Sequence, residues 1–333
     1  MEAVVPRSHK RFRITDAAHI GDARRYARDL AIAAAMASET VGKIEIIVNE
    51  MATNLVKHTE QGGDLLVCRF DGEDAATIEL LCIDRGRGII DVEKSFTDGN
   101  STAGTMGTGL GAIRRLSDCF DVWSEPGAGT LLKSRKGSAV SGKGVDIGVE
   151  GLSIALEGEE LCGDGWAFAR RSGHLWVCLV DGLGHGASAH LAAAAGLKAF
   201  AANFDASPIQ VVKKADAAMR GTQGGAVYVG HVEREKGLLS YCSVGNITGR
   251  VFNVEGKSRG CVSMPGIVGY NMSSVKEFDQ PQTAADSLVI ATDGLKSSFN
   301  LTAKQLKSKL APALLYRDFA RGNDDVTAVV IHG

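Results

Sequence analysis

Four aspartate motifs in the second half of the chain limit what it can fold into. They are centred on Asp164 in CGDG, Asp181 in LVDGLGHG, Asp293 in ATDG and Asp324 in NDDVT. Three of them adjoin apolar runs that predict buried strands, at Leu175–Val180, Leu288–Ala291 and Val326–Ile331. Carboxylates at the ends of core strands are costly to bury unless a positive charge lies between them. Because no motif contains Lys or Arg, we expect hard divalent cations, toward which a glycine after the aspartate lets the backbone carbonyl turn.

The composition is that of an ordinary globular protein. The 333 residues are 44% hydrophobic and 23% charged, which leaves room for two domains. The formal net charge of −2 gives no general attraction to nucleic acid or an anionic membrane, so neither is an expected partner. We find no apolar stretch of about 18 residues and no secretory signal. Seven cysteines without a C-x-x-C pair indicate reduced thiols in a cytoplasmic protein.

A Gly-, Ser- and Lys-rich stretch divides the chain. Residues 136–146 lack aromatic side chains and predict a linker between domains at 1–135 and 147–333. Before it the pattern predicts two helices, two strands, a glycine-rich loop, a short helix and a final strand. After it the pattern is mostly strand, with helices near Ser188–Phe204 and Pro208–Arg220, the second capped by Ser207. The expected class is therefore α+β with two unrelated domains.

Residues 41–58 predict an amphipathic helix with functional groups on its polar face. The apolar stripe consists of Ile44, Ile47, Val48, Met51 and Leu55. On the polar face Glu50 and Asn54 are four apart, and Lys57 or His58 follows at the next turn. Such a pair suits a metal–nucleotide site, in which Asn binds Mg²⁺ and Glu orients or deprotonates a hydroxyl. A merely solvated polar face has the same pattern.

Two glycine motifs follow the predicted strands at 65–70 and 77–83. Asp84 in DRGRGI can accept from an exocyclic amine while Gly86 and Gly88 let the backbone pass close to a ring. The loop AGTMGTGLGAIRRL leads into a helix whose N-terminal N–H groups can bind phosphate. Its candidate binding residues are Gly104, Gly107, Thr108, Gly109, Leu110 and Gly111. It is not a Walker A loop, because no Gly-Lys-Ser/Thr follows.

In their order and spacing, these three blocks resemble the N, G1 and G2 boxes of the GHKL ATPases. The greatest similarity is to the small anti-sigma and switch serine kinases of the RsbT, RsbW and SpoIIAB type, over roughly residues 10–135. The resemblance implies a Bergerat α/β sandwich that binds ATP and Mg²⁺. It implies Glu50 as the catalytic base, Asn54 as the Mg²⁺ ligand, Asp84 as the adenine-reading residue and Gly104–Gly111 as the lid over ATP.

The aspartate series, in the order GD, DGxGHG, TDG and DDxT, resembles the PPM (protein phosphatase 2C) phosphatases of the SpoIIE and RsbX branch. The resemblance spans residues 147–333 and implies an αββα sandwich with two Mn²⁺ or Mg²⁺ ions that activate water for attack on a phosphoserine or phosphothreonine. It implies ligands at Asp164, Asp181, Gly182 (through its carbonyl), Asp293 and Asp324. Asp181 would bridge the two ions, whereas Asp325 is expected to point away.

Three further features near these motifs have weaker implications. His185 either donates a proton to the leaving serine oxygen or shapes the turn after Gly182. Cys162 and Cys178 are expected in the core and not as nucleophiles. Many relatives have a second acid shortly after the first Asp, but here residues 167 and 168 are Ala and Phe, so no third ion is expected.

Together the two halves predict a bifunctional bacterial signalling protein of the stress-response, partner-switching kind. One half would be a metal-dependent Ser/Thr phosphatase and the other an ATP-dependent Ser/Thr kinase. The resemblance implies a phosphorylated STAS-type antagonist as partner, together with a sigma factor or another switch protein, and a homodimer. In the alternative, the N-terminal half only binds ATP or a partner and regulates the phosphatase.

Overall fold

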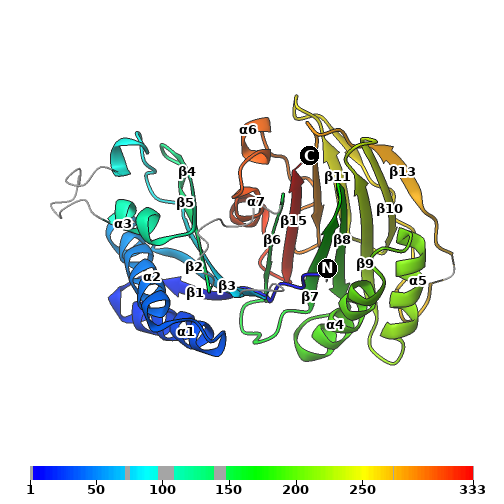
Figure 1. Cartoon of the computed structure of the whole chain (residues 1–333), viewed down its shortest axis with the longest axis horizontal. Coiled ribbons are helices and arrows are strands. Elements are labelled where there is room, and N and C mark those ends of the chain that lie inside the picture. The colour runs from blue at the N-terminus through cyan, green and yellow to red at the C-terminus, as the bar shows by residue number, and fades with distance from the viewer. Residues whose placement is uncertain (1–2, 72–75, 97–108, 139–147, 273, 333) are drawn as a thin grey trace. The chain divides into compact units, whose positions relative to one another are not determined.

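The computed structural model describes residues 3–71, 76–96, 109–138, 148–272 and 274–332. The chain divides into two compact units (Figure 1). One unit is His9–Asp146, and the other joins Met1–Ser8 to Ile147–Gly333. Most of the predicted linker, from residue 139 onward, lies outside the described residues.

The N-terminal unit is a five-stranded antiparallel sheet with helices against one face (Figure 1). The strand order is β1-β2-β3-β5-β4. Its elements are β1 Lys10–Ile14, α1 Ile20–Ala33, α2 Ser38–His58, β2 Gly63–Asp71, β3 Ala76–Asp84, α3 Gly109–Leu116, β4 Cys119–Glu125 and β5 Gly129–Gly137, with short 3-10 turns at Ala17–His19 and Lys94–Phe96.

The helix predicted at residues 41–58 is α2, and its apolar stripe is confirmed. Ile44, Ile47, Met51 and Leu55 are all fully buried and pack in one core with α1 and the sheet. The 3.6-residue period thus places Glu50 on the side of the helix that is only partly covered.

The sequence prediction missed one strand at each end of this unit. The basic segment β1 was not predicted to be a strand, yet it pairs with β2 along its length and buries Ile14. Cross-strand pairing at a sheet edge stabilises a strand that its own composition does not favour. Two strands follow α3, where one was predicted, because β4 turns back through residues 126–128 to pair with β5.

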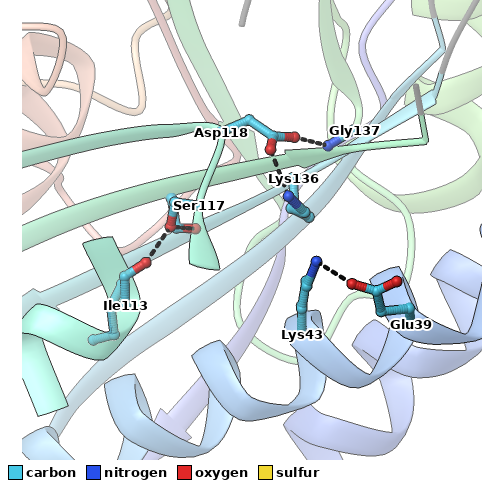
Figure 2. A network of polar contacts seen from close by, with 8 residues as sticks. Glu39, Lys43, Ile113, Ser117, Asp118, Lys136 and Gly137 are labelled. Carbon is cyan, nitrogen blue, oxygen red and sulfur yellow. Dashed lines mark hydrogen bonds and ion pairs between the residues drawn. The ribbon is translucent and has the colours of Figure 1, made fainter. Parts of the chain in front are cut away.

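Polar contacts fix the junction between α3 and β4 (Figure 2). Ser117 Oγ donates to the Ile113 carbonyl at 2.7 Å and so satisfies a carbonyl in the last turn of α3. Asp118 accepts from the Gly137 N–H at 2.8 Å and forms an ion pair with Lys136, both on β5. The C-terminal end of α3 is therefore anchored to the sheet, which fixes the direction in which its first residues point.

The C-terminal unit is an αββα sandwich of two five-stranded sheets (Figure 1). One sheet has the order β13-β10-β9-β8-β7 with α4 and α5 packed on it, and the other has the order β12-β11-β14-β15-β6 with α7 packed on it. The elements are β6 Val149–Ile154, β7 Asp164–Arg171, β8 His174–Gly182, α4 Gly186–Asn203, α5 Pro208–Met219, β9 Gly225–Glu233, β10 Leu238–Val244, β11 Thr248–Phe252, β12 Ser258–Gly260, β13 Phe278–Pro281, β14 Ser287–Ala291, α6 Ala303–Leu306, α7 Ala311–Phe319 and β15 Val326–His332.

The strands predicted beside the aspartates are β8, β14 and β15, and the two predicted helices are α4 and α5. None of the helices in the described parts of the chain combines the length and apolarity that a bilayer span requires. The predicted cap of α5 is wrong in its chemistry. Ser207 occupies the N-cap position, but its side chain makes no capping bond. The Glu277 carboxylate instead accepts from the Ile209 N–H at 2.9 Å, so a distant acid caps this helix.

Candidate active sites

The N-terminal candidate site forms where α2 meets the start of α3. Glu50 and Asn54 lie on α2, as predicted, and Gly109 is the first residue of α3. A Cβ atom on Gly109 would lie 2.9 Å from Glu50 Oε2 and 3.6 Å from Asn54 Oδ1. The end of the glycine-rich loop therefore packs directly on the acid–amide pair, and a side chain there would displace the carboxylate.

Of the predicted loop residues, Gly109, Leu110 and Gly111 form the first turn of α3. Gly111 is buried and Leu110 is half-buried against the helical core. Gly104, Gly107 and Thr108 lie outside the described residues.

Asp84 ends β3, and its carboxylate organises the turn that follows. Its Oδ1 accepts from the Gly86 N–H at 2.7 Å and from the Thr130 N–H at 3.0 Å. Gly88 has φ +70°, and a Cβ atom there would lie 2.1 Å from the Glu125 carbonyl oxygen. The second glycine of DRGRG is thus required both by backbone conformation and by close packing on the end of β4.

Sequence reasoning missed Ser124 and Thr130, which lie beside Asp84. Ser124 Oγ accepts from the Ile89 N–H at 2.8 Å and contacts Thr130 Oγ1 at 2.9 Å. The hydroxyl pair therefore links the β4–β5 hairpin to the turn after Asp84. The sequence does show a Gly-Thr pair after the turn at 126–128. No local pattern, however, connects that pair to Asp84.

Lys57 and His58 both lie exposed at the end of α2. Although the residue is exposed, its imidazole is partly desolvated, which lowers the pKa of His58; the charges of Arg87 and Lys57 lower it further, while Asp84 opposes them. The imidazole therefore interacts electrostatically with the turn after β3. His58 therefore lies near Asp84 and Arg87.

The C-terminal candidate site is built around two directly paired aspartates. Asp164 begins β7 and Asp181 lies near the end of β8, and the two are opposite each other in the antiparallel register. Asp164 is buried, and its Oδ2 accepts from Thr292 Oγ1 at 2.8 Å. Asp181 Oδ2 is buried without any hydrogen-bond partner. An orphaned carboxylate oxygen beside a second buried acid is costly unless a cation compensates it.

Asp293 and Asp324 approach Asp181 from the other sheet. Burial raises the pKa of Asp181 to about 7, and the charges of Asp293, Asp324 and Asp325 add to the effect. Burial also raises the pKa of Asp164 well above its ordinary value, with Asp181 as the next cause. Within the described residues, no lysine or arginine forms an ion pair with these acids.

The outer acids are oriented by their neighbours. Asn246 Nδ2 donates to Asp293 Oδ2 at 2.8 Å, and Asp324 Oδ1 accepts from the Asp325 N–H at 2.9 Å. As they stand, no three His, Cys, Asp or Glu side chains of the described residues close on a single point as a metal shell would. The acids nevertheless lie close enough for Asp293, Asp324 and Asp325 to raise the pKa of Asp181, and their oxygen donors are of the kind that Mg²⁺ and Mn²⁺ accept.

Asp325 has a different task from the acid before it. Its two oxygens accept from the Leu156 N–H at 2.7 Å and from the Gly163 N–H at 2.8 Å. The carboxylate therefore closes the loop between β6 and β7 at both ends, and both of its oxygens are engaged.

The glycines of the aspartate motifs are required mainly by packing. A Cβ atom on Gly182 would lie 2.2 Å from the Ala189 carbonyl oxygen, and one on Gly294 would lie 1.9 Å from the Asp325 carbonyl oxygen. Neither glycine needs a left-handed conformation. The close approach of neighbouring chain segments therefore gives a second reason for glycine at these two positions, beside the predicted freedom of its carbonyl to turn toward an ion.

His185 follows Asp181 in the same turn and contacts Glu159, which sequence reasoning missed. The distance between His185 Nδ1 and Glu159 Oε1 is 2.7 Å. Cys162 and Cys178 are buried, as predicted for core residues, and burial raises the pKa of both thiols. Ala167 and Phe168 are buried within β7.

The chain matches two family models in succession. The histidine kinase-like ATPase domain matches residues 14–136, and stage II sporulation protein E (SpoIIE) matches residues 171–332. Both matches agree with the fold classes predicted from the motifs.

Known proteins resemble each half separately. Serine/threonine-protein kinase RsbT of Bacillus subtilis is 28% identical over 114 residues, which is 34% of this chain and 85% of RsbT. The anti-sigma F factor of Caldanaerobacter subterraneus subsp. tengcongensis is 32% identical over 103 residues, or 29% of this chain and 71% of that protein.

For the C-terminal half, phosphoserine phosphatase RsbX of Bacillus subtilis is 25% identical over 140 residues, which is 42% of this chain and 70% of RsbX. A crystal structure of RsbX in complex with magnesium superposes with a TM-score of 0.50 at 21% identity, and covers 55% of this chain and 92% of that one.

Proposed function

The chain belongs to the histidine kinase-like ATPase family through its N-terminal domain and to the SpoIIE phosphatase family through its C-terminal domain, and from this premise we propose a bifunctional signalling role. The C-terminal domain hydrolyses phosphoserine or phosphothreonine on a regulatory protein and requires a divalent cation. The N-terminal domain binds ATP with Mg²⁺ and transfers phosphate to a serine or threonine. One chain would then both add and remove the same kind of mark.

The phosphatase proposal depends mainly on the orphaned oxygen of Asp181 among like charges. All candidate ligands are oxygens, which suits Mn²⁺ or Mg²⁺ and not zinc. Asp164, Asp181, the Gly182 carbonyl, Asp293 and Asp324 would hold the two ions, with Asp181 as the ligand common to both, Asp164 and Gly182 serving one ion and Asp293 and Asp324 the other. Two such ions, when bound, supply charge stabilisation to the phosphoryl oxygens and activate water for in-line attack.

The chain's own residues prepare this site. Thr292 holds one oxygen of Asp164, and Asn246 holds one oxygen of Asp293, so each acid has a preferred orientation. Asp325 anchors the neighbouring loop and is not assigned as a ligand. The ligands are thereby supported by residues that carry no positive charge, which preserves the negative potential of the site.

The test is phosphate release from a phosphoserine peptide by the full chain with and without Mn²⁺ or Mg²⁺. Asp181→Ala should abolish the metal-dependent rate. Asp205→Ala is the matched control, because Asp205 is exposed and pairs with Arg171 at the surface. Wild-type turnover that persists in Asp181→Ala would refute the assignment of Asp181.

The kinase proposal is supported by the contact of Gly109 with Glu50 and Asn54. We assign Glu50 as the base toward the acceptor hydroxyl and Asn54 as the Mg²⁺ ligand. Asp84, held by the Thr130 N–H, would read the adenine amine, with His58 near the same turn. The segment Gly104–Gly111 would close over the phosphates.

The alternative for this domain is nucleotide or partner binding that only regulates the phosphatase. Labelled ATP and a STAS-type antagonist distinguish the two. Transfer that is lost in Glu50→Ala while nucleotide binding persists supports a kinase. A wild-type chain that binds nucleotide but transfers nothing supports the regulator.

The named activities of the relatives suggest the class of partner. RsbT is named a protein kinase and the Caldanaerobacter protein an anti-sigma factor. We therefore propose a phosphorylated STAS-type antagonist as substrate, with a sigma factor or another switch protein as a further partner, and a homodimer as the assembly. Co-purification with the Asp181→Ala chain would identify the phosphoprotein.

A further inference from the structure

The first residues of the chain belong to the C-terminal unit, although the N-terminal domain follows them in the sequence. Met1–Ser8 form one compact unit with Ile147–Gly333. The Val4 N–H donates to the Phe168 carbonyl at 2.7 Å, and the Phe168 N–H donates to the Val4 carbonyl at 3.0 Å. This antiparallel bridge lies on β7, close to the end of the chain marked N in Figure 1. Residues 3–8, the N-terminal segment, therefore add to the sheet that contains Asp181.

The N-terminal segment pairs with β7 on the side that other strands leave open. β7 is the last strand in the order β13-β10-β9-β8-β7. The edge of a sheet carries backbone N–H and C=O groups that need partners. Ala3 also packs against the core cluster that contains Ala167 and Ala169 of β7. The segment thus supports the edge of the strand whose first residue is Asp164.

The pairing can open without disturbing the rest of the sheet. Val4 and Phe168 form an isolated bridge and not a continuous ladder. Val4 is only half-buried, and Val5 is 40% exposed. Chain ends held by few contacts open locally at the lowest cost in free energy. The segment therefore has a paired state and a released state, which are separated by two backbone hydrogen bonds and the packing of Ala3.

The other end of the segment is held firmly in the N-terminal unit. His9 is buried, and its Nε2 donates to Glu79 Oε1 at 3.0 Å. Glu79 Oε2 accepts from Arg135 Nε at 2.6 Å, so the ion pair joins His9 to β3 and β5. Only Val5–Ser8 lie between this anchor and the bridge on β7, and among them Pro6 is buried with a restricted φ. The connection therefore has little slack to absorb a movement of His9.

From His9 the chain continues into the candidate nucleotide site. It forms β1, which pairs with β2, and β2 pairs with β3. Ile14 at the end of β1 is opposite Gly63, and Gly63 is opposite Asp84. The three residues form one row across the sheet, at the end where Asp84 is assigned to the adenine amine. A nucleotide held by Asp84 would therefore act on the same row that ends β1.

We propose that the N-terminal segment is a releasable edge strand through which the nucleotide site controls the metal site. The inference rests on the proposed function of both domains and concerns how one regulates the other. In the paired state the edge of β7 is held, and Asp164 at its first position favours metal binding. In the released state this support is lost, and the metal is bound more weakly. Since the coupling is thermodynamic, the metal changes nucleotide affinity by the same factor.

The test measures how ADP changes the affinity of the full chain for Mn²⁺. ADP has no γ-phosphate to transfer, and buffering of free Mn²⁺ removes the effect of chelation by the nucleotide. Phosphate release from a phosphoserine peptide at each free Mn²⁺ concentration gives the affinity, which saturating ADP should change by about 5–150-fold. Amide exchange at Phe168 reports the pairing independently of turnover. Protection of this amide should rise if ADP tightens Mn²⁺ binding and fall if ADP weakens it.

Three variants separate the pairing from the connection. Val4→Pro removes a donor and places ring atoms against the Phe168 carbonyl, so ADP should then change Mn²⁺ affinity by less than about twofold. Val4→Ala is the matched control, because it keeps both backbone hydrogen bonds and should keep the effect of ADP. A short Gly-Ser linker inserted after Arg7 adds slack and leaves the bridge intact. This insertion should keep the Phe168 amide protected and still abolish the effect of ADP.

The outcomes distinguish failure of this inference from failure of the proposed function. A wild type that binds ADP and hydrolyses the peptide, with a Mn²⁺ affinity that ADP does not change, overturns the inference alone. The inference is also overturned if the effect of ADP survives in Val4→Pro or in the linker insertion, or if protection at Phe168 moves opposite to the affinity. A wild type that does not bind ADP, or does not hydrolyse the peptide, overturns the proposed function and the inference with it.

Discussion

Replacing Asp181 with asparagine should stabilise the metal-free protein at pH 8, although it removes an acid from the candidate site. The pKa of Asp181 is raised from 3.8 to about 7, mainly by burial and then by Asp293 and Asp324. The folded state therefore keeps a proton that the unfolded state releases between these two values. Because the folded state binds more protons, stability falls as pH rises from about 4 to about 7 and levels off above it. Asparagine mimics the protonated acid and carries no charge to desolvate.

The size of the effect follows from the same interval. Each tenfold change in proton affinity is worth about 1.4 kcal/mol, so the interval between 3.8 and about 7 corresponds to about 4 kcal/mol at most. Since Asp181 is only partly buried as a residue, we expect Asp181→Asn to gain about 2–4 kcal/mol at pH 8 and almost nothing at pH 4. The pKa of Asp164 is raised as well, so some pH dependence should remain in the variant.

The assay is hydrogen exchange of the β7 and β8 amides of the full chain in EDTA between pH 4 and 8.5, after correction for intrinsic exchange. This readout isolates the C-terminal domain, whereas a single denaturation midpoint would mix two domains. Asp181→Asn should show a flatter stability profile and greater protection at pH 8. A variant that is less protected than the wild type at pH 8, or equally pH-dependent, would refute the account of Asp181 as an uncompensated buried charge.

Two other substitutions test the two sites separately. Gly109→Ala should weaken binding of a fluorescent ATP analogue by at least about tenfold, because the new methyl group displaces Glu50 Oε2. Gly42→Ala lies on α2, the helix that carries Glu50, and meets nothing within 4 Å, so it should leave binding unchanged while stabilising the fold by about 0.5–1 kcal/mol; equal affinities for the two variants would contradict the packing argument. Thr292→Val removes the donor to Asp164 and should lower Mn²⁺ affinity about 10–100-fold by calorimetry, so an unchanged affinity would show that this hydroxyl does not orient a ligand.

Local periodicity was sufficient to predict the position of a residue wherever that position depends only on the helix or strand that contains it. The 3.6-residue pattern located α2 and its polar face, and apolar runs located β8, which contains Asp181 near its end, and β14, which ends shortly before Asp293. The pairing of β1 could not be predicted, because a basic five-residue segment becomes a strand only through its partner β2.

The missed residues are those whose partners are distant in sequence. Thr130 contacts Asp84 across 46 residues, and Glu159 contacts His185 across 26. Neither contact has a local spacing signal, since hydrogen bonds of this kind depend on the tertiary arrangement of loops. That Glu277 and not Ser207 caps α5 could not be predicted for the same reason, because Glu277 is distant from this helix in the sequence.

We expect the acids around Asp181 to hold a pair of divalent cations. Electron paramagnetic resonance of the full chain titrated with Mn²⁺ tests it most directly, because two ions about 4 Å apart are magnetically coupled. The wild type should show a spin-coupled pair that saturates at two ions in this site and disappears in Asp181→Ala, with any single uncoupled ion at the nucleotide site unaffected. An uncoupled signal alone in the wild type, or a coupled pair that survives Asp181→Ala, would contradict it.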